Sequence, residues 1–270
     1  METLLDVRNV SLSYHTAEGE TQALSNISFQ VKKGEFLAIV GPSGCGKSTL
    51  LDLICGLLTP ESGSIILSGF QKGKDRAEIG YMLQKDHLLE WRTVYQNVIL
   101  GLEIRHQLTQ ERKAYVNHLL ALYGLDKFRK SHPSQLSGGM RQRAALIRTL
   151  ALQPDLLLLD EPFSALDYQT RLNVSDDIGK IIKREAKTAI LVTHDISEAI
   201  SMADRILILS KRPAVVKDLV NIHFSLRNRT PLESRNAPEF KNYFNLIWKE
   251  LNDHDTSLEG TNPVSEKEKA

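Results

Sequence analysis

Long hydrophobic runs are missing from this sequence of 270 residues. Apolar runs such as LLLL at 156–159 fall far short of the roughly 20 residues that a membrane-spanning helix needs. The opening stretch METLLDVRNV is not basic, and no long apolar stretch follows it, so no secretory signal peptide is visible. We therefore expect a chain that does not itself span a membrane.

Cysteine and surplus charge are also scarce. The two cysteines, Cys45 and Cys55, are too few for a disulfide framework and predict reduced thiols in a cytosolic protein. The formal net charge is +1, so the chain lacks the strong basicity that is typical of nucleic-acid binding. The apolar fraction of 41% is ordinary, and this length suits one large α/β domain or two small lobes.

Apolar runs of strand length alternate with helical patterns along most of the chain. Continuous apolar runs, which are typical of strands buried on both faces, occur at 36–40, 156–159, 189–192 and 206–209. Helical spacing lies between the later runs, which predicts a mostly parallel sheet. Residues 1–35 are typical of an antiparallel β piece, and helical periodicity over about 86–155 predicts an inserted helical lobe.

The stretch GPSGCGKST at 41–49 carries the strongest chemical signal. It matches G-x-x-x-x-G-K-S, follows a predicted buried strand and opens a helix, which is the context that a phosphate-binding loop requires. We expect Lys47 to reach the β- and γ-phosphates, Ser48 to ligate Mg²⁺ and Thr49 to contact an α-phosphate oxygen. The alternative is a glycine-rich turn with an incidental lysine. The residues expected at the nucleotide are Gly41, Pro42, Ser43, Gly44, Cys45, Gly46, Lys47, Ser48 and Thr49.

Two acidic residues follow another buried run. LLLLDEP at 156–162 places Asp160 at the C-terminal end of a strand, where α/β sheets bind ligands. Its carboxylate can hold Mg²⁺ through water, and Glu161 is the candidate general base for an attacking water. A DE pair after a strand is by itself more often a solvated loop, and its combination with the phosphate loop favours the catalytic interpretation.

Gln84 and His194 also follow strand-like runs. Gln84 comes after IGYML and could bring its amide to Mg²⁺ or water, while His194 ends AILVTH at the same predicted sheet edge. From there His194 could contact the γ-phosphate or the catalytic water. A lone histidine is usually structural or exposed, so position alone leaves both roles open.

A second glycine-rich turn, LSGGMRQR at 136–143, opens a basic helix. Ser137 is a good N-cap, and Gly138 and Gly139 permit close backbone approach, so this helix start is a second candidate anion site. Two copies arranged head-to-tail could each cover the other's phosphate loop, with ATP between the subunits. The alternative is an ordinary capped helix with a basic first turn.

Over about residues 4–225 these motifs resemble the nucleotide-binding subunits of ATP-binding cassette (ABC) transporters, because LSGGMRQR is similar to that family's signature motif. The resemblance implies an α/β fold of the P-loop NTPase type: a mostly parallel sheet with an antiparallel β subdomain and an inserted α-helical subdomain. It also implies an ATPase whose hydrolysis of ATP, with Mg²⁺, is coupled to transport.

The resemblance assigns further site residues. It implies that Gln84 is the Q-loop glutamine, that Asp160 and Glu161 are the metal-binding aspartate and the catalytic glutamate, and that His194 is the switch histidine. Tyr14 matches the aromatic residue that stacks on adenine. The D-loop corresponds to Ser164, Ala165, Leu166 and Asp167.

The same resemblance implies an organisation and partners. We expect an ABC ATPase domain over 4–235, a C-terminal helix over 236–252 that either packs on the body or acts in regulation, and a disordered tail over 253–270. The expected assembly is a homodimer on the cytoplasmic face of the membrane. It is peripheral and is joined to separate permease subunits and an extracytoplasmic solute-binding protein, with no nucleic acid.

A narrower resemblance concerns HLLEWRTVYQNV at 87–98, which is similar to a stretch of importers for nitrate, taurine and other sulfonates, and of some relatives that carry thiamine precursors. Leu88, Leu89 and Trp91 form a candidate docking surface for a permease helix, the alternative being that Trp91 is core. The competing functions are a soluble ABC ATPase of DNA repair or translation, a phosphate-loop kinase, and a non-catalytic nucleotide-dependent scaffold.

Overall fold

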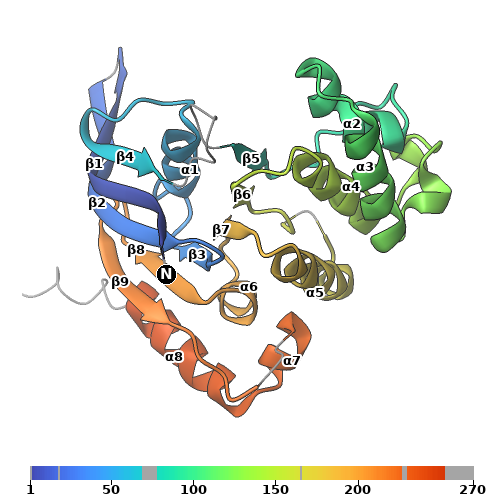
Figure 1. Cartoon of the computed structure of the whole chain (residues 1–270). Coiled ribbons are helices and arrows are strands. Elements are labelled where there is room, and N and C mark those ends of the chain that lie inside the picture. Colours follow the sequence, from blue (N-terminus) through green and yellow to red (C-terminus); the bar gives the residue numbers. More distant parts are fainter. Residues whose placement is uncertain (1, 18, 69–77, 165, 227–229, 253–270) are drawn as a thin grey trace, which may run out of the picture.

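The computed structural model describes residues 2–17, 19–68, 78–164, 166–226 and 230–252. Two sheets form the body, and a group of helices stands to one side of it (Figure 1). In these described ranges no helix is long and apolar enough to cross a membrane. The tail at 253–270, expected to be disordered, and Ala165 of the expected D-loop lie outside the described residues.

The larger sheet has the strand order β5-β6-β7-β3-β8-β9. All neighbouring strands from β5 to β8 pair in parallel, and β9 is antiparallel to β8. The mostly parallel sheet is therefore confirmed. The strands are β3 (Phe36–Val40), β5 (Ile79–Met82), β6 (Leu156–Asp160), β7 (Thr188–Val192), β8 (Arg205–Leu209) and β9 (Val216–Asn221).

No strand was expected at β9. Its sequence VKDLVN mixes charged and apolar residues, and only Val220 is buried. The strand lies at the edge of the sheet, where charged side chains are common because one side of an edge strand faces solvent. It therefore carries no continuous apolar run that sequence periodicity could detect.

The smaller sheet is antiparallel, with the order β2-β1-β4, which confirms the predicted antiparallel β piece. Its strands are β1 (Thr3–Thr16), β2 (Gly19–Lys32) and β4 (Ser62–Leu67). Helix α1 (Lys47–Cys55) lies between this sheet and the larger one (Figure 1). The smaller sheet thus covers the element that begins at the phosphate loop.

Alternate residues of the central strands enter two different hydrophobic cores. Leu37 and Ile39 of β3 pack with β1, β2 and α1, whereas Ala38 and Val40 pack with the helices on the opposite face. Both faces of the sheet are covered, which is why its strands carry continuous apolar runs.

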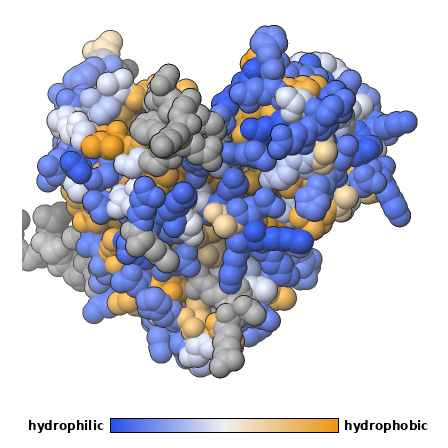
Figure 2. All heavy atoms as spheres, viewed as in Figure 1, coloured by the Kyte–Doolittle hydropathy of each residue, from blue (hydrophilic) through white to orange (hydrophobic). Residues whose placement is uncertain are grey.

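Three helices lie between β5 and β6, where the sequence predicts a helical insertion: α2 (Val94–Ile104), α3 (Gln110–Leu122) and α4 (Gly138–Leu150). Short 3-10 turns at Asp126–Phe128 and Pro133–Gln135 connect α3 to α4. Figure 2 shows a notch in the outline of the molecule between this helical group and the part that contains the smaller sheet.

The remaining helices lie on the face of the larger sheet that is opposite to the smaller sheet. They are α5 (Tyr168–Arg184), α6 (Ile196–Met202), α7 (Pro231–Arg235) and α8 (Pro238–Asn252). Helix α8 packs on the body, because Ile247 is fully buried and the hydroxyl of Tyr243 donates to the carbonyl of His223 at 3.1 Å. Packing on the body, one of the two expectations for this segment, is therefore confirmed.

Candidate active site

The phosphate loop turns sharply between β3 and α1. Gly44 and Gly46 have φ of +72° and +116°, a region that favours glycine. Gly46 is the N-cap of α1 and offers no side chain to the first helical N–H groups. A helix start without a side-chain cap, next to a curled loop, is suited to bind an anion through backbone N–H groups.

Two buried side chains of the loop have different uses. Lys47 is 6% exposed, and its ammonium donates to the carbonyls of Gly41 at 2.9 Å and Pro42 at 3.0 Å, so its charge is held over the loop. The thiol of Cys45 is buried, and that burial raises its pKa. Only the backbone of Cys45 is thus available to an anion, whereas Ser43 and Ser48 are exposed.

A hydroxyl and a carboxylate meet beside the loop. Ser48 Oγ donates to Asp160 Oδ1 at 3.2 Å, and Asp160 ends β6 with 8% of its surface exposed. Burial raises the pKa of this carboxyl. The pair offers hard oxygen ligands of the kind that Mg²⁺ prefers, so these two residues would hold the ion. The described part of the chain contains no cluster of three or more His, Cys, Asp or Glu side chains suited to a metal.

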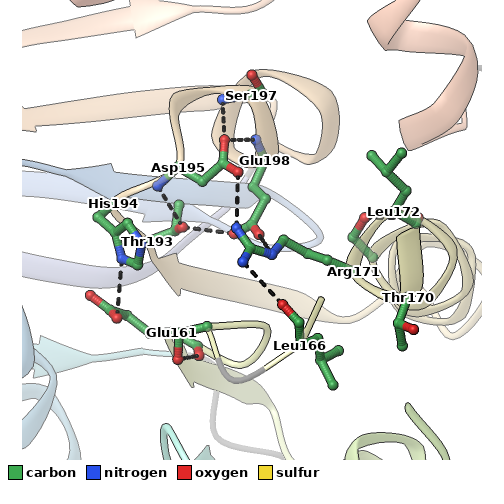
Figure 3. Close-up of polar contacts among 12 residues, drawn as sticks. Glu161, Leu166, Thr170, Arg171, Leu172, Thr193, His194, Asp195, Ser197 and Glu198 are labelled. Atoms are coloured by element: carbon green, nitrogen blue, oxygen red, sulfur yellow. Dashed lines mark hydrogen bonds and ion pairs between the residues drawn. The ribbon is translucent and has the colours of Figure 1, made fainter. Parts of the chain in front are cut away.

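Two segments distant in the sequence converge on Glu161. Gln84 Nε2 donates to Glu161 Oε2 at 3.2 Å, and His194 Nδ1 lies 3.2 Å from the same oxygen (Figure 3 shows the histidine contact). Glu161 has φ of +43°, a left-handed conformation that is uncommon for residues other than glycine. Such strain tends to occur at functional sites. The structure therefore brings together three of the predicted residues.

The expected D-loop begins beside this cluster. Ser164 Oγ donates to the carbonyl of Glu161 at 3.0 Å, and Asp167 caps α5 by accepting from the N–H of Thr170 at 3.0 Å. On the other side of the phosphate loop, the hydroxyls of Tyr14 and Thr49 are 3.0 Å apart, and Tyr14 is 40% exposed. Tyr14 is thus near the start of α1 and open to a ligand.

The glycine turn at residues 137–139, hereafter the signature turn, opens α4. Ser137 caps the helix by accepting from the N–H of Met140 at 3.4 Å. Helix α4 belongs to the core on one face of the larger sheet, and α1 belongs to the core on the other. Within one chain, therefore, the two glycine turns begin helices on opposite faces of the sheet.

The stretch after Gln84 corrects part of the predicted docking surface. Trp91 is 75% exposed, so the alternative that it is core is wrong. Leu88 is only 7% exposed and belongs to the core, which excludes it from the surface, while Leu89 is half-buried. The buried amide of Asn97 holds this loop by bonding both the N–H and the carbonyl of Leu89, at 2.7 and 3.1 Å.

Sequence reasoning missed several charged residues near the site. Arg212 Nη2 donates to the carbonyl of Gly44 at 2.7 Å, and nothing in the local sequence pattern indicates that contact. Behind His194, a polar network joins Arg171, Thr193, Asp195 and Glu198 (Figure 3). Asp195 before the helix at 196–202 is an N-cap signal that could have been found.

A family model for ABC transporters matches residues 24–164, a span that includes the phosphate loop, the signature turn and Glu161. The chain belongs to the ABC transporter family. It is an ATP-binding subunit of that family, with ATPase activity coupled to transport. This membership argues against the phosphate-loop kinase.

The chain is similar to named relatives over most of its length. It is 46% identical to the uncharacterized ABC transporter ATP-binding protein YtlC of Bacillus subtilis. The match covers 93% of this chain and 96% of YtlC. It is 38% identical to the taurine import ATP-binding protein TauB of Roseobacter denitrificans, over 91% of this chain and 94% of TauB. A solved dimeric post-hydrolysis state of the ATP-binding cassette MJ0796, bound to ADP and phosphate, matches with a TM-score of 0.68 and 31% identity, covering 82% of this chain and 99% of that chain.

Glu198 is the buried carboxyl of the network. It is 3% exposed and accepts from Thr193 Oγ1 at 2.7 Å. Burial raises its pKa to about 7, although the hydrogen bond from Thr193 and the charges of Arg171 and Arg235 act in the opposite direction. The neighbouring Asp195 carboxylate adds to the rise.

We predict that Glu198→Gln changes how stability depends on pH. Because the folded protein binds the Glu198 proton more tightly than the unfolded chain, the contribution of Glu198 to the free energy of unfolding falls between about pH 4.5 and pH 7. The variant lacks that loss, so relative to the wild type it should gain up to about 2 kcal/mol between pH 5 and pH 8. Urea titrations at both pH values measure the difference. Glu111→Gln, at an exposed position, should show no such gain, and equal pH slopes in wild type and Glu198→Gln would contradict the prediction.

Proposed function

We propose that this chain is the ATP-hydrolysing subunit that powers a membrane importer for a small anion such as taurine, another sulfonate or nitrate. The observation that carries the enzymatic part is the convergence of Gln84 and His194 on Glu161 beside the phosphate loop. The similarity to a taurine import protein over most of both chains supports the transported class. It also favours transport over the DNA repair and translation alternative.

The nucleotide lies along the phosphate loop in this proposal. The backbone N–H groups of 41–49 and the ammonium of Lys47 hold the β- and γ-phosphates, and Tyr14 stacks on the adenine. Ser48, Asp160 and Gln84 would hold Mg²⁺. When bound, Mg²⁺ neutralises negative charge on the phosphates. The hydrogen bond from Ser48 Oγ to Asp160 Oδ1, at 3.2 Å, supports this assignment because it brings two oxygen ligands together.

In the reaction the bond between the γ-phosphorus and the β–γ bridging oxygen of ATP breaks, the γ-phosphoryl group passes to water, and ADP and inorganic phosphate are released. Glu161 accepts a hydrogen bond from that water, orients it and takes its proton. His194 and Gln84 hold the Glu161 carboxylate in place, so that positioning and charge neutralisation provide most of the catalysis. An intact Glu161 and His194 argue against a non-catalytic scaffold.

The working unit is a head-to-tail homodimer. Each signature turn then contacts the γ-phosphate bound to the partner subunit's phosphate loop. The arrangement of α1 and α4 on opposite faces of the sheet supports this sharing, and the dimeric MJ0796 structure is a precedent for a paired cassette. ATP bridges both subunits only in the closed dimer, so binding favours closure and hydrolysis favours opening.

The permease docks beside the Q-loop. Leu89 and Trp91, together with the half-exposed Leu83 just before Gln84, provide apolar surface next to a residue that contacts the catalytic glutamate. An exposed tryptophan beside the Q-loop is suited to pack against a helix of the permease. The subunit is accordingly peripheral, on the cytoplasmic face of the membrane. An extracytoplasmic binding protein delivers the anion, and no nucleic acid takes part.

The first prediction of this proposal concerns Glu161→Gln. The amide keeps the shape of the side chain but cannot take a proton from water, so turnover should fall by about 10²–10⁴-fold while ATP binding is retained. Steady-state phosphate release and a fluorescent-nucleotide titration measure the two quantities. Glu20→Gln, on an exposed strand position, is the control. Normal turnover by Glu161→Gln would remove this residue from the role of base.

The second prediction tests shared sites. Lys47→Ala and Ser137→Arg should each inactivate a homodimer, because each removes a component of both sites. A mixed dimer of the two variants, isolated with two affinity tags, contains one intact site if the signature turn acts on the partner subunit. ATPase activity should therefore reappear in the mixed dimer alone. No recovery would mean that the loop and the turn act within one chain, or that no dimer forms.

The third prediction concerns coupling to the permease. Trp91→Ala should leave the ATPase activity of the isolated subunit unchanged and reduce ATP-driven uptake of labelled taurine, sulfonate or nitrate by roughly tenfold. Proteoliposomes with the co-purifying membrane subunits measure uptake. Trp248→Ala, a comparably exposed tryptophan on α8, is the matched control. Full uptake by Trp91→Ala would exclude this docking surface, and no uptake of any of the three anions by the wild type would exclude the proposed substrate class.

A further inference from the structure

Arg171, on the first turns of α5, contacts three groups from two other segments (Figure 3). Its Nη2 donates to the carbonyl of Leu166 at 3.1 Å, within the expected D-loop. Its Nη1 lies 3.5 Å from Asp195 Oδ2, and its Nε lies 3.8 Å from Glu198 Oε1. The side chain is 23% exposed, and its Nε makes no hydrogen bond within the described residues. One guanidinium therefore spans the start of α5 and the start of α6.

The segment that Arg171 contacts also carries His194. Asp195 Oδ1 accepts from the N–H groups of Ser197 and Glu198, which caps α6. Thr193 Oγ1 accepts from the N–H of Asp195 at 3.0 Å and donates to Glu198 Oε2 at 2.7 Å. His194 is thus held between two neighbours that belong to one hydrogen-bonded unit, and Arg171 is the charged group that attaches this unit to α5.

The same end of α5 is packed closely against the signature turn. A Cβ on Gly138 would lie 3.1 Å from Leu166 Cδ2, and a Cβ on Gly139 would lie 2.9 Å from Val174 Cγ2 and 3.3 Å from Thr170 Cγ2. The two glycines therefore approach α5 and Leu166 more closely than larger residues could. A displacement of the turn towards α5 would therefore press on Leu166, Thr170 and Val174.

We propose that Arg171 is a positioning residue that couples the signature turn to His194 of the same subunit. This inference rests on the proposed function, in which the two features of one subunit serve different nucleotides of the dimer. Arg171 then links the two ATP sites. When the turn engages the partner's nucleotide, α5 and the carbonyl of Leu166 carry the displacement to Arg171, which sets the position of the segment bearing His194.

The geometry at position 171 requires the guanidinium of arginine, and a positive charge alone is not sufficient. The guanidinium presents donors in a rigid planar fork that can face a carbonyl and two carboxylates together, whereas a lysine ammonium is a single point of charge. The 3.5 and 3.8 Å separations from Asp195 and Glu198 exceed ordinary hydrogen-bond lengths, so these two contacts are ion pairs. Lysine at 171 would keep the charge and lose the simultaneous contacts.

The test uses the mixed dimer with one intact site. One subunit carries Lys47→Ala and lends its signature turn to that site, and the other carries Ser137→Arg and supplies the phosphate loop, Glu161 and His194. Arg171→Ala is introduced into either subunit. Placed in either one, it should lower kcat of the intact site by about 2- to 30-fold with little change in KM, since coupling residues commonly contribute on that scale. Arg171→Lys should reproduce most of the loss.

The controls separate coupling from folding and from the proposed function. Arg184→Ala, at the exposed far end of α5, should leave kcat unchanged, and thermal unfolding of each variant shows whether the fold persists. Unchanged kcat when Arg171→Ala is in the subunit that lends its turn would overturn the coupling, even if the other placement reduces kcat. Failure of the proposed dimer is distinguishable, because the mixed dimer would then be inactive before any change at Arg171.

Discussion

Four neighbouring parallel strands, β5, β6, β7 and β3, end at one edge of the larger sheet, and the site depends on that alignment. Gln84 follows β5, Asp160 ends β6 and Glu161 comes directly after it, His194 follows β7, and the phosphate loop follows β3. Carboxyl ends of parallel strands meet at the same edge because each strand runs in the same direction. Residues far apart in the sequence thus meet at this edge, where hydrogen bonds such as those of Ser48 with Asp160 and Gln84 with Glu161 then join them.

The two hydrophobic cores make that edge rigid. Strands β3, β6 and β7 are buried on both faces, so their ends cannot shift independently of one another. The left-handed backbone at Glu161 is tolerated in this setting, where its N–H donates to the carbonyl of Val192 at 2.9 Å. In the proposed dimer this rigid edge holds the phosphate loop and Glu161. The signature turn lies instead at the start of α4, in the helical group.

The sequence was most informative where one short stretch contains the whole signal. GPSGCGKST, the run before Asp160 and the capped turn at Ser137 each combine a local backbone requirement with a chemical one, and each forms as predicted. It was least informative where the signal is distributed. Edge strand β9 carries no apolar run, and the inward turn of Leu88 depends on a buried amide at Asn97.

By itself the sequence determined the mostly parallel sheet, the inserted helices and the family, and it nominated the residues that we expect to face the nucleotide, because these follow from periodicity and from motifs within a few residues. The tertiary structure alone decided which side chains touch. That Glu161 receives both Gln84 and His194, that Trp91 is exposed while Leu88 is buried, and that Arg171 joins the D-loop to the segment bearing His194 all depend on packing between distant elements. A single sequence contains no local pattern for such contacts, since they arise only when the sheet and its two cores have assembled.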